Sequence, residues 1–194
     1  KTSNLTNQQA IFINSDGTSL TSQQYAFKIN QGKLYFISGS GLFESNGVNV
    51  GSAQLDPSEW HYVSLTYDSL AIRFYVNGAL DYENYVTDYF PSTPAGVAWI
   101  GKSFGANNVP LDGALNRLSI WNTALSQEQI QQYMNCPPTG SETGLVGYWN
   151  FEEGSGTTAL DQTSNGNDGT INGATYSTDV PEQTCLGCSA TDSV

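Results

Sequence analysis

Short apolar runs separated by turn residues repeat along most of this 194-residue chain. In residues 63–67 and 71–76, "VSLTY" and "AIRFYV", apolar side chains alternate with polar ones, as in a strand with one buried face. Asn77-Gly78 follows the second run and tolerates the positive φ angles of a two-residue hairpin turn. Gln31-Gly32 has the same role between two earlier runs. The pattern therefore predicts antiparallel hairpins.

These hairpins predict two antiparallel sheets packed face to face. We expect strands over residues 10–14, 25–30, 33–38, 61–67, 71–76, 97–101, 114–121 and 145–151. The side chains expected between the sheets are Val63, Leu65, Ile72, Phe74, Val76, Leu118 and Ile120.

One short helix is predicted at residues 126–135, "SQEQIQQYMN". Ser126 and Gln129 have the spacing of a capping box, in which each side chain accepts a hydrogen bond from the other residue's backbone N–H. Pro137 and Pro138 cannot continue a helix, so the helix ends before them.

The composition changes after the helix, where paired prolines and small polar residues at 135–144 indicate a linker. We predict a β-sandwich over residues 1–135 and a C-terminal segment over 136–180 that completes the sandwich. Residues 181–194 are interpreted as a tail or as the start of a following module.

Acidic side chains outnumber basic ones, with 18 Asp+Glu against 6 Lys+Arg and a net charge of -12. This field repels phosphate backbones and anionic lipids, which argues against nucleic acid and membranes as partners. No run approaches the roughly 20 apolar residues of a membrane-spanning helix. No signal-peptide pattern begins at Lys1, so we expect any export signal to lie outside this sequence.

The three cysteines, Cys136, Cys185 and Cys188, all lie in the last third of the chain. His61, the single histidine, is remote from them, so the closely spaced ligands of a zinc site are missing. A disulfide between Cys136 and Cys185 is the preferred interpretation, and a bond between Cys185 and Cys188 is the alternative. Either bond indicates an oxidising compartment, so we expect a secreted or cell-surface protein.

Two longer motifs carry a family resemblance. Residues 59–78, "EWHYVSLTYDSLAIRFYVNG", and residues 99–130, with "WIGKSF" and "LDGALNRLSIWNTALSQEQI", resemble the LamG-like, pentraxin-like jelly roll of the concanavalin A-type sandwiches. "GLVGYWNFEEGSG", from residue 144, is similar to the segment that commonly opens such modules in secreted Bacteroidetes surface proteins. The resemblance implies an all-β, two-sheet antiparallel jelly-roll sandwich with one short helix.

Two departures from the family pattern stand out. The segment from residue 144 comes last here, although it usually comes first, so either Lys1 begins within a module or this segment completes the sheet in a permuted order. Asn116 stands where the family often carries an aspartate, which weakens any carboxylate role at that position.

Catalysis is not expected. Glycan-cleaving enzymes of this class carry a Glu-x-Asp-x-x-Glu motif, which aims an acid and a nucleophile into one cleft, and this spacing is missing here. Asp81 and Glu83 share one face of a hairpin but lack a third carboxylate, whereas Glu152 and Glu153 would point to opposite faces of a strand. His61 has no partner motif and is interpreted as a packed or strand-edge residue.

Residues 161–169, "DQTSNGNDG", combine Asp, Asn and glycine in one loop, where oxygens can converge on calcium at about 2.3–2.6 Å. A loop of hydrogen-bonded Asx turns explains the composition equally well. The resemblance favours calcium, because jelly rolls of this kind often use a structural calcium ion. The ligands expected on that basis are Asp161, Asn165, Asp168, Glu152 and Asp112.

A second candidate site lies at residues 81–96, "DYENYVTDYFPSTPAG", where aromatic and acidic side chains suit sugar rings and their hydroxyls. The candidate ligand-binding residues are Tyr82, Tyr85, Tyr89 and Phe90. The alternative is that these side chains simply cover the sheet.

These observations predict a non-catalytic extracellular module for adhesion or carbohydrate binding. Its expected partners are a carbohydrate or a surface glycoprotein, together with other modules of the same large protein. The alternative is a passive spacer module, and a glycan-cleaving enzyme is the least supported function.

Overall fold

The computed structural model describes residues 1–3, 8–15, 23–38, 49–85, 97–102, 110–182 and 185. The chain divides into two compact units, Lys1–Ala114 and Leu115–Val194. The described part consists of strands in antiparallel pairs and a single short helix, so the predicted all-β fold class is confirmed.

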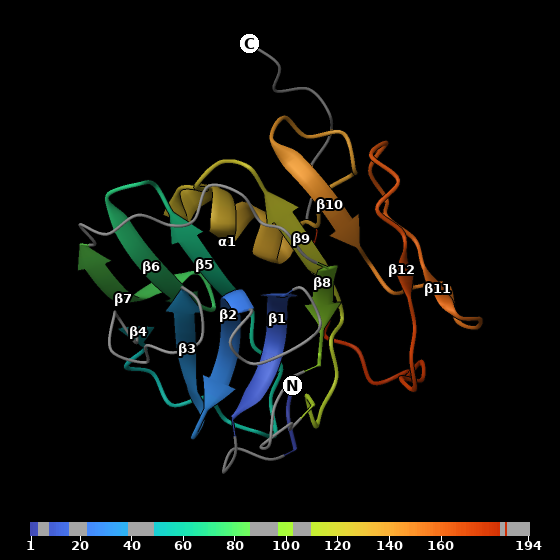
Figure 1. Ribbon diagram of the computed structural model, residues 1–194, viewed down its shortest axis with the longest axis horizontal. Coiled ribbons are helices and arrows are strands. Elements are labelled where there is room, and N and C mark those ends of the chain that lie inside the picture. Colours follow the sequence, from blue (N-terminus) through green and yellow to red (C-terminus); the bar gives the residue numbers. More distant parts are fainter. Residues whose placement is uncertain are drawn as a thin grey trace. The chain divides into compact units, whose positions relative to one another are not determined.

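The larger sheet of the first unit has the strand order β4-β3-β2-β1-β8 (Figure 1). Every neighbouring pair is antiparallel. Gln31 and Gly32, between β2 and β3, have φ angles of 50° and 75°, which confirms the predicted turn. The strands are β1 (Gln9–Ser15), β2 (Gln23–Asn30), β3 (Lys33–Ser38), β4 (Asn49–Val50) and β8 (Val97–Ile100).

The smaller sheet of this unit has the order β5-β6-β7, with β5 (Val63–Tyr67), β6 (Ala71–Val76) and β7 (Ala79–Tyr85). Asn77 and Gly78 have φ angles of 51° and 76° and join β6 to β7 as predicted. Leu65 lies opposite Phe74, and Val63 lies opposite Val76. Because paired residues share a face, the apolar side chains of β5 and β6 form one surface.

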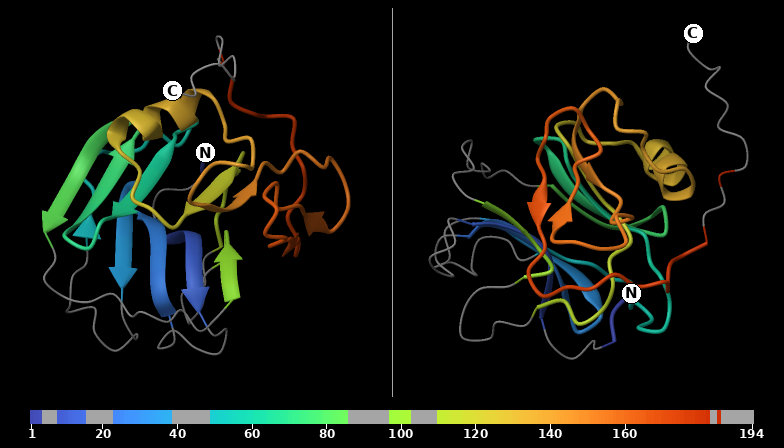
Figure 2. Two further views of the ribbon diagram at one scale, coloured as in Figure 1. Left: turned by 90° about the horizontal axis from the view of Figure 1, so that it is seen from above. Right: turned by 90° about the vertical axis from the view of Figure 1, so that its right-hand side faces the viewer.

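This apolar surface packs on the larger sheet, and Figure 2 shows the two sheets as separate layers. The ring of Phe74 lies 5.9 Å from the ring of Phe27 on β2 and 5.2 Å from the ring of Tyr82 on β7. Phe74 and Ile72 are fully buried, whereas Val63 is half-buried nearer the margin. The first unit is therefore a sandwich whose interior is filled by aromatic and branched side chains.

The second unit contains β9 (Leu118–Trp121) paired with β10 (Leu145–Trp149) and β11 (Thr158–Ala159) paired with β12 (Gly169–Thr170). Leu118 and Ile120 are half-buried on β9. Helix α1 (Gln127–Asn135) begins at Ser126, and the predicted capping box with Gln129 is present. The predicted modules 1–135, 136–180 and 181–194 stay predictions.

Truncation of Phe74 should lower the stability of the first unit more than any other single change. We expect Phe74→Ala to lower the free energy of unfolding by about 3–5 kcal/mol, because it removes a fully buried ring and leaves a cavity. Equilibrium urea denaturation measures this loss. Leu70→Ala is the matched control, since Leu70 is 68% exposed, and it should change stability by less than about 0.5 kcal/mol. Equal effects of the two variants would contradict the assignment of the core.

Candidate ligand-binding surface

The aromatic residues predicted to contact a ligand are not equivalent. Tyr82 is half-buried and packs its ring on buried Phe74, so it lies on the inner face of the sheet. Tyr85, at the end of β7, is 71% exposed. Tyr89 and Phe90 lie outside the described residues. Of the four candidates, Tyr85 therefore offers an aromatic surface to solvent.

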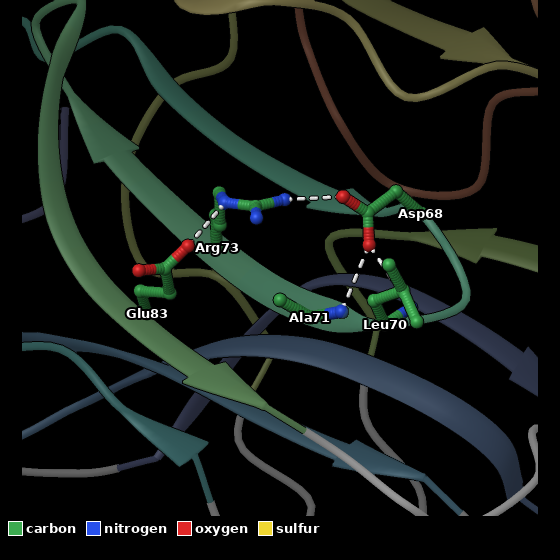
Figure 3. A network of polar contacts seen from close by, with 5 residues as sticks. All are labelled: Asp68, Leu70, Ala71, Arg73 and Glu83. Atoms are coloured by element: carbon green, nitrogen blue, oxygen red, sulfur yellow. Dashed lines mark hydrogen bonds and ion pairs between the residues drawn. The ribbon is translucent and has the colours of Figure 1, made fainter.

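The sequence analysis missed a polar network on β6 and β7, which Figure 3 shows. Arg73 on β6 stands between two carboxylates: its Nε donates to Glu83 Oε1 at 2.6 Å, and its Nη1 donates to Asp68 Oδ2 at 2.6 Å. The other Asp68 oxygen accepts the backbone N–H groups of Leu70 and Ala71 at 3.0 and 2.8 Å. The guanidinium is thus fixed at both ends.

The register of the sheet brings this network and Tyr85 onto one face. Arg73 lies opposite Glu83, and Ala71 lies opposite Tyr85. Glu83 and Tyr85 are two positions apart on β7, so their side chains leave the strand on the same side. We call the set Asp68, Arg73, Glu83 and Tyr85 the β6–β7 face.

Asp68 and Arg73 are held in their ionised forms. The hydrogen bond from Arg73, together with those from Ala71 and Leu70, lowers the pKa of Asp68 to about 2. The hydrogen bonds to Asp68 and Glu83 raise the pKa of Arg73. Both groups are therefore charged throughout the physiological pH range, and Asp68 cannot serve as a proton donor there.

The Asp81 carboxylate, which the sequence placed beside Glu83, has a structural role. It accepts the backbone N–H groups of Ser52, at 3.1 Å to each oxygen, and of Ala53 at 2.6 Å. A side chain at Gly51 would overlap this carboxylate, so the close approach requires glycine. Asp81 thus ties β7 to the chain that follows β4.

His61 lies at the entry to β5, as the sequence indicated. Its Nε2 lies 3.0 Å from the backbone nitrogen of Asp56, and its Nδ1 lies 3.3 Å from the Asn77 side-chain nitrogen. These contacts join the turn that precedes β5 to the β6–β7 turn, so His61 acts as a structural residue.

The loop predicted to bind calcium is closed by its own hydrogen bonds. Asp161 Oδ1 accepts the backbone N–H groups of Tyr148 and Thr163, both at 3.0 Å. Its Oδ2 accepts the Thr163 hydroxyl and the Asn167 N–H, both at 2.9 Å. Burial raises the pKa of Asp161, but these hydrogen bonds outweigh it and lower the pKa overall. The lone pairs that an ion would use are already engaged.

The other expected calcium ligands of the second unit are hydrogen-bonded within the protein or exposed. Asp168 accepts the backbone N–H of Asp161 at 2.9 Å, and Asn165 donates its side-chain N–H to the Val146 carbonyl. Glu152 is exposed, and Asp112 belongs to the first unit, so its place in this ligand set stays a prediction. Within the described residues, no three His, Cys, Asp or Glu side chains are grouped as a metal site. The residues present thus do not fit a calcium site as they stand, and calcium binding stays a prediction.

The two described cysteines lie near each other without a bond between them. The Sγ of Cys185 donates to the carbonyl oxygen of Asn135, the residue before Cys136, at 3.0 Å. The structure does not join Cys136 and Cys185 by a disulfide, and Cys188 lies outside the described residues. The disulfide stays a prediction. The hydrogen bond from Cys185 to Asn135 brings the two segments of the chain together.

Comparison with known proteins identifies the family. The profile of the concanavalin A-like lectin/glucanases superfamily, Laminin_G_3, matches residues 1–131. The chain belongs to this family. No curated protein matches the chain. No helix in the described part of this concanavalin A-like chain is long and apolar enough to cross a membrane.

One solved structure with the same fold is a protein from Bacteroides ovatus ATCC 8483 named a "putative carbohydrate binding protein". It is 20% identical, with a TM-score of 0.60, and the match covers 87% of this chain and 54% of that one. An S-layer domain-containing protein from Clostridium thermocellum ATCC 27405 is 22% identical with a TM-score of 0.34, over 68% of this chain and 64% of that one. The concanavalin A-like chain thus spans about half the length of the first neighbour.

Replacement of Asp161 should destabilise the second unit. We expect Asp161→Asn to lower the free energy of unfolding by about 2 kcal/mol at pH 7, because an amide cannot accept the same set of charge-assisted hydrogen bonds. Since the pKa of Asp161 is lowered on folding, this contribution is present above pH ~4 and should disappear as the pH falls through the folded pKa. Urea denaturation of both proteins over this pH range measures the difference.

A calcium chelator distinguishes stabilisation by these hydrogen bonds from stabilisation by a bound calcium ion. With chelator present, the loss caused by Asp161→Asn should persist, because the donors are groups of the protein itself. Glu152→Gln is the matched control, since Glu152 is an exposed acidic residue of the same predicted ligand set. A loss seen only in calcium would instead support the predicted ion.

Oxidation should join Cys136 to Cys185. We expect peptide mapping of protein produced under oxidising conditions to find this bond, because Cys185 already contacts the residue beside Cys136. The closed loop of nearly fifty residues should add about 3–4 kcal/mol to unfolding stability in the chain-entropy account. A bond between Cys185 and Cys188, or only thiols, would contradict this prediction.

Proposed function

We propose that this chain is a non-catalytic carbohydrate-binding module of a secreted or cell-surface protein. The observation that carries the proposal is the β6–β7 face, where exposed Tyr85 lies beside a fixed arginine and its two acidic partners on a concanavalin A-like sandwich. An aromatic ring with flanking hydrogen-bonding groups suits a sugar, which has an apolar C–H face and a polar rim. The name of the Bacteroides ovatus neighbour points to the same class of ligand.

The state of the carboxyl groups supports binding without catalysis. A glycosidase needs one carboxylic acid with a raised pKa, which protonates the leaving group. Hydrogen bonds to the ionised form lower the pKa of Asp56, Asp68 and Glu128. At Glu142, Glu153 and Asp161 burial is the largest single effect and raises the pKa, but the hydrogen bonds together outweigh it. These six groups are poor general acids at neutral pH.

A secreted or surface location is supported by two observations and agrees with the proposed ligands. The net charge of -12 favours solubility and repels anionic membranes. The cysteine contact beside Cys136 would become a stabilising bond in an oxidising compartment. Polysaccharides and surface glycoproteins, the ligands that we propose, are also found there. Adhesion to such a glycoprotein would use the same surface.

A glycan array with the purified protein tests the proposal. We expect binding to at least one carbohydrate class and no release of reducing sugar from laminarin, agar or xylan. Released sugar would indicate a glycan-cleaving enzyme. Failure to bind any glycan on a broad array would contradict the proposal and favour a passive spacer module.

A further inference from the structure

The β6–β7 face presents one hydrogen-bond donor group and one acceptor that the protein does not use. Arg73 employs Nε and Nη1 in its two ion pairs, so among the described residues its Nη2 has no partner. Glu83 likewise uses one carboxylate oxygen and leaves Oε2 without a partner in that part of the chain. The 2.6 Å bond between Nε and Oε1 holds the two side chains against each other.

This pair of groups is complementary to two neighbouring hydroxyls on a sugar ring. One hydroxyl oxygen can accept from Nη2, and the adjacent hydroxyl can donate to Oε2, since each hydroxyl is both donor and acceptor. Both protein groups are charged, so each bond would be charge-assisted. Because Arg73 is held by Asp68 and Glu83 before any ligand arrives, little side-chain entropy would be lost on binding.

Tyr85 supplies the apolar part of the same surface. Its side chain is 71% exposed and stands two positions from Glu83, which along a strand is about 7 Å. A ring at that distance can lie against the C–H face of a sugar whose hydroxyls reach Arg73 and Glu83.

Charge decides which sugars can bind there. Asp68 and Glu83 together carry two negative charges against one on Arg73, and the whole chain has a net charge of -12. Uronates and sulfated sugars would bring further negative charge to this face and be repelled. The surface therefore favours sugars without charge.

We propose that the β6–β7 face binds uncharged glycans through two neighbouring hydroxyl groups, with Tyr85 stacked on the ring and Arg73 and Glu83 holding the hydroxyls. This inference rests on the proposed carbohydrate-binding function and adds its location and its ligand class.

Calorimetry with defined hexasaccharides tests the ligand class. The neutral probes are cellohexaose, laminarihexaose, mannohexaose and xylohexaose, and the acidic probes are hexagalacturonate and a heparin hexasaccharide. We expect at least one neutral probe to bind, with an affinity that changes less than twofold between 0.05 and 0.5 M salt, because no net charge is neutralised. Tighter binding of either acidic probe would overturn the proposed class.

Two variants test the location with the best neutral probe. Tyr85→Ala should weaken binding at least tenfold, because it removes the stacking ring. Arg73→Lys keeps the charge between Asp68 and Glu83 but removes Nη2, and should weaken binding at least fivefold. Leu80→Ala is the matched control on β7, since Leu80 is 48% exposed and lies outside the proposed contacts.

The outcomes separate this inference from the proposed function. If the protein binds a neutral probe and both variants bind as the wild type does, the location is wrong while carbohydrate binding stands. If the protein binds no glycan on the array, the proposed function itself fails. Circular dichroism melts identify a misfolded variant. Because Tyr85 is exposed, Tyr85→Ala is the variant whose folding should be least affected.

Discussion

The Asp81 carboxylate, held by the backbone N–H groups of Ser52 and Ala53, is the contact on which the exposed surface of β7 depends. Phe74 pairs with Tyr82 and Tyr75 pairs with Leu80, so Asp81 is the extra residue of a β-bulge. The bulge advances the later part of β7 by one residue. Every side chain beyond it therefore takes the opposite face from the one that an unbroken hairpin would give.

This one-residue shift explains which parts of the first unit could be predicted from sequence. The faces of β5 and β6 follow directly from alternation, because Val63, Leu65 and Phe74 lie in regular register. Counted from the Asn77-Gly78 turn without a bulge, Arg73 would oppose Tyr82, and Glu83 would share the buried face of Ile72. In the structure Arg73 opposes Glu83, and Tyr82 turns inward. Alternation alone puts Tyr82 and Tyr85 on opposite faces of β7, and the bulge decides that Tyr85 is the one that faces outward.

The Asp161 loop shows a different limit of sequence reasoning. An Asp/Asn/Gly-rich loop supplies oxygens for an ion and also acceptors for its own backbone, and the composition is the same in both cases. The difference lies in where the N–H groups of the loop point. Here those of Thr163 and Asn167 converge on one buried carboxylate, with that of Tyr148 from β10. Asp161 thereby closes the loop and fastens it to a strand. That convergence depends on backbone angles that the sequence leaves open.

Arg73 is likewise fixed by hydrogen bonds within the protein. The chain has 18 acidic and only 6 basic side chains. An arginine that moves freely in solution loses side-chain entropy when it binds a ligand. Asp68 and Glu83 remove most of that freedom during folding. Exposed ion pairs of this kind contribute little to stability, so their effect on the fold alone is small. Their larger consequence is geometric: they hold a planar guanidinium at a fixed position beside Tyr85, as recognition of a polar ligand requires.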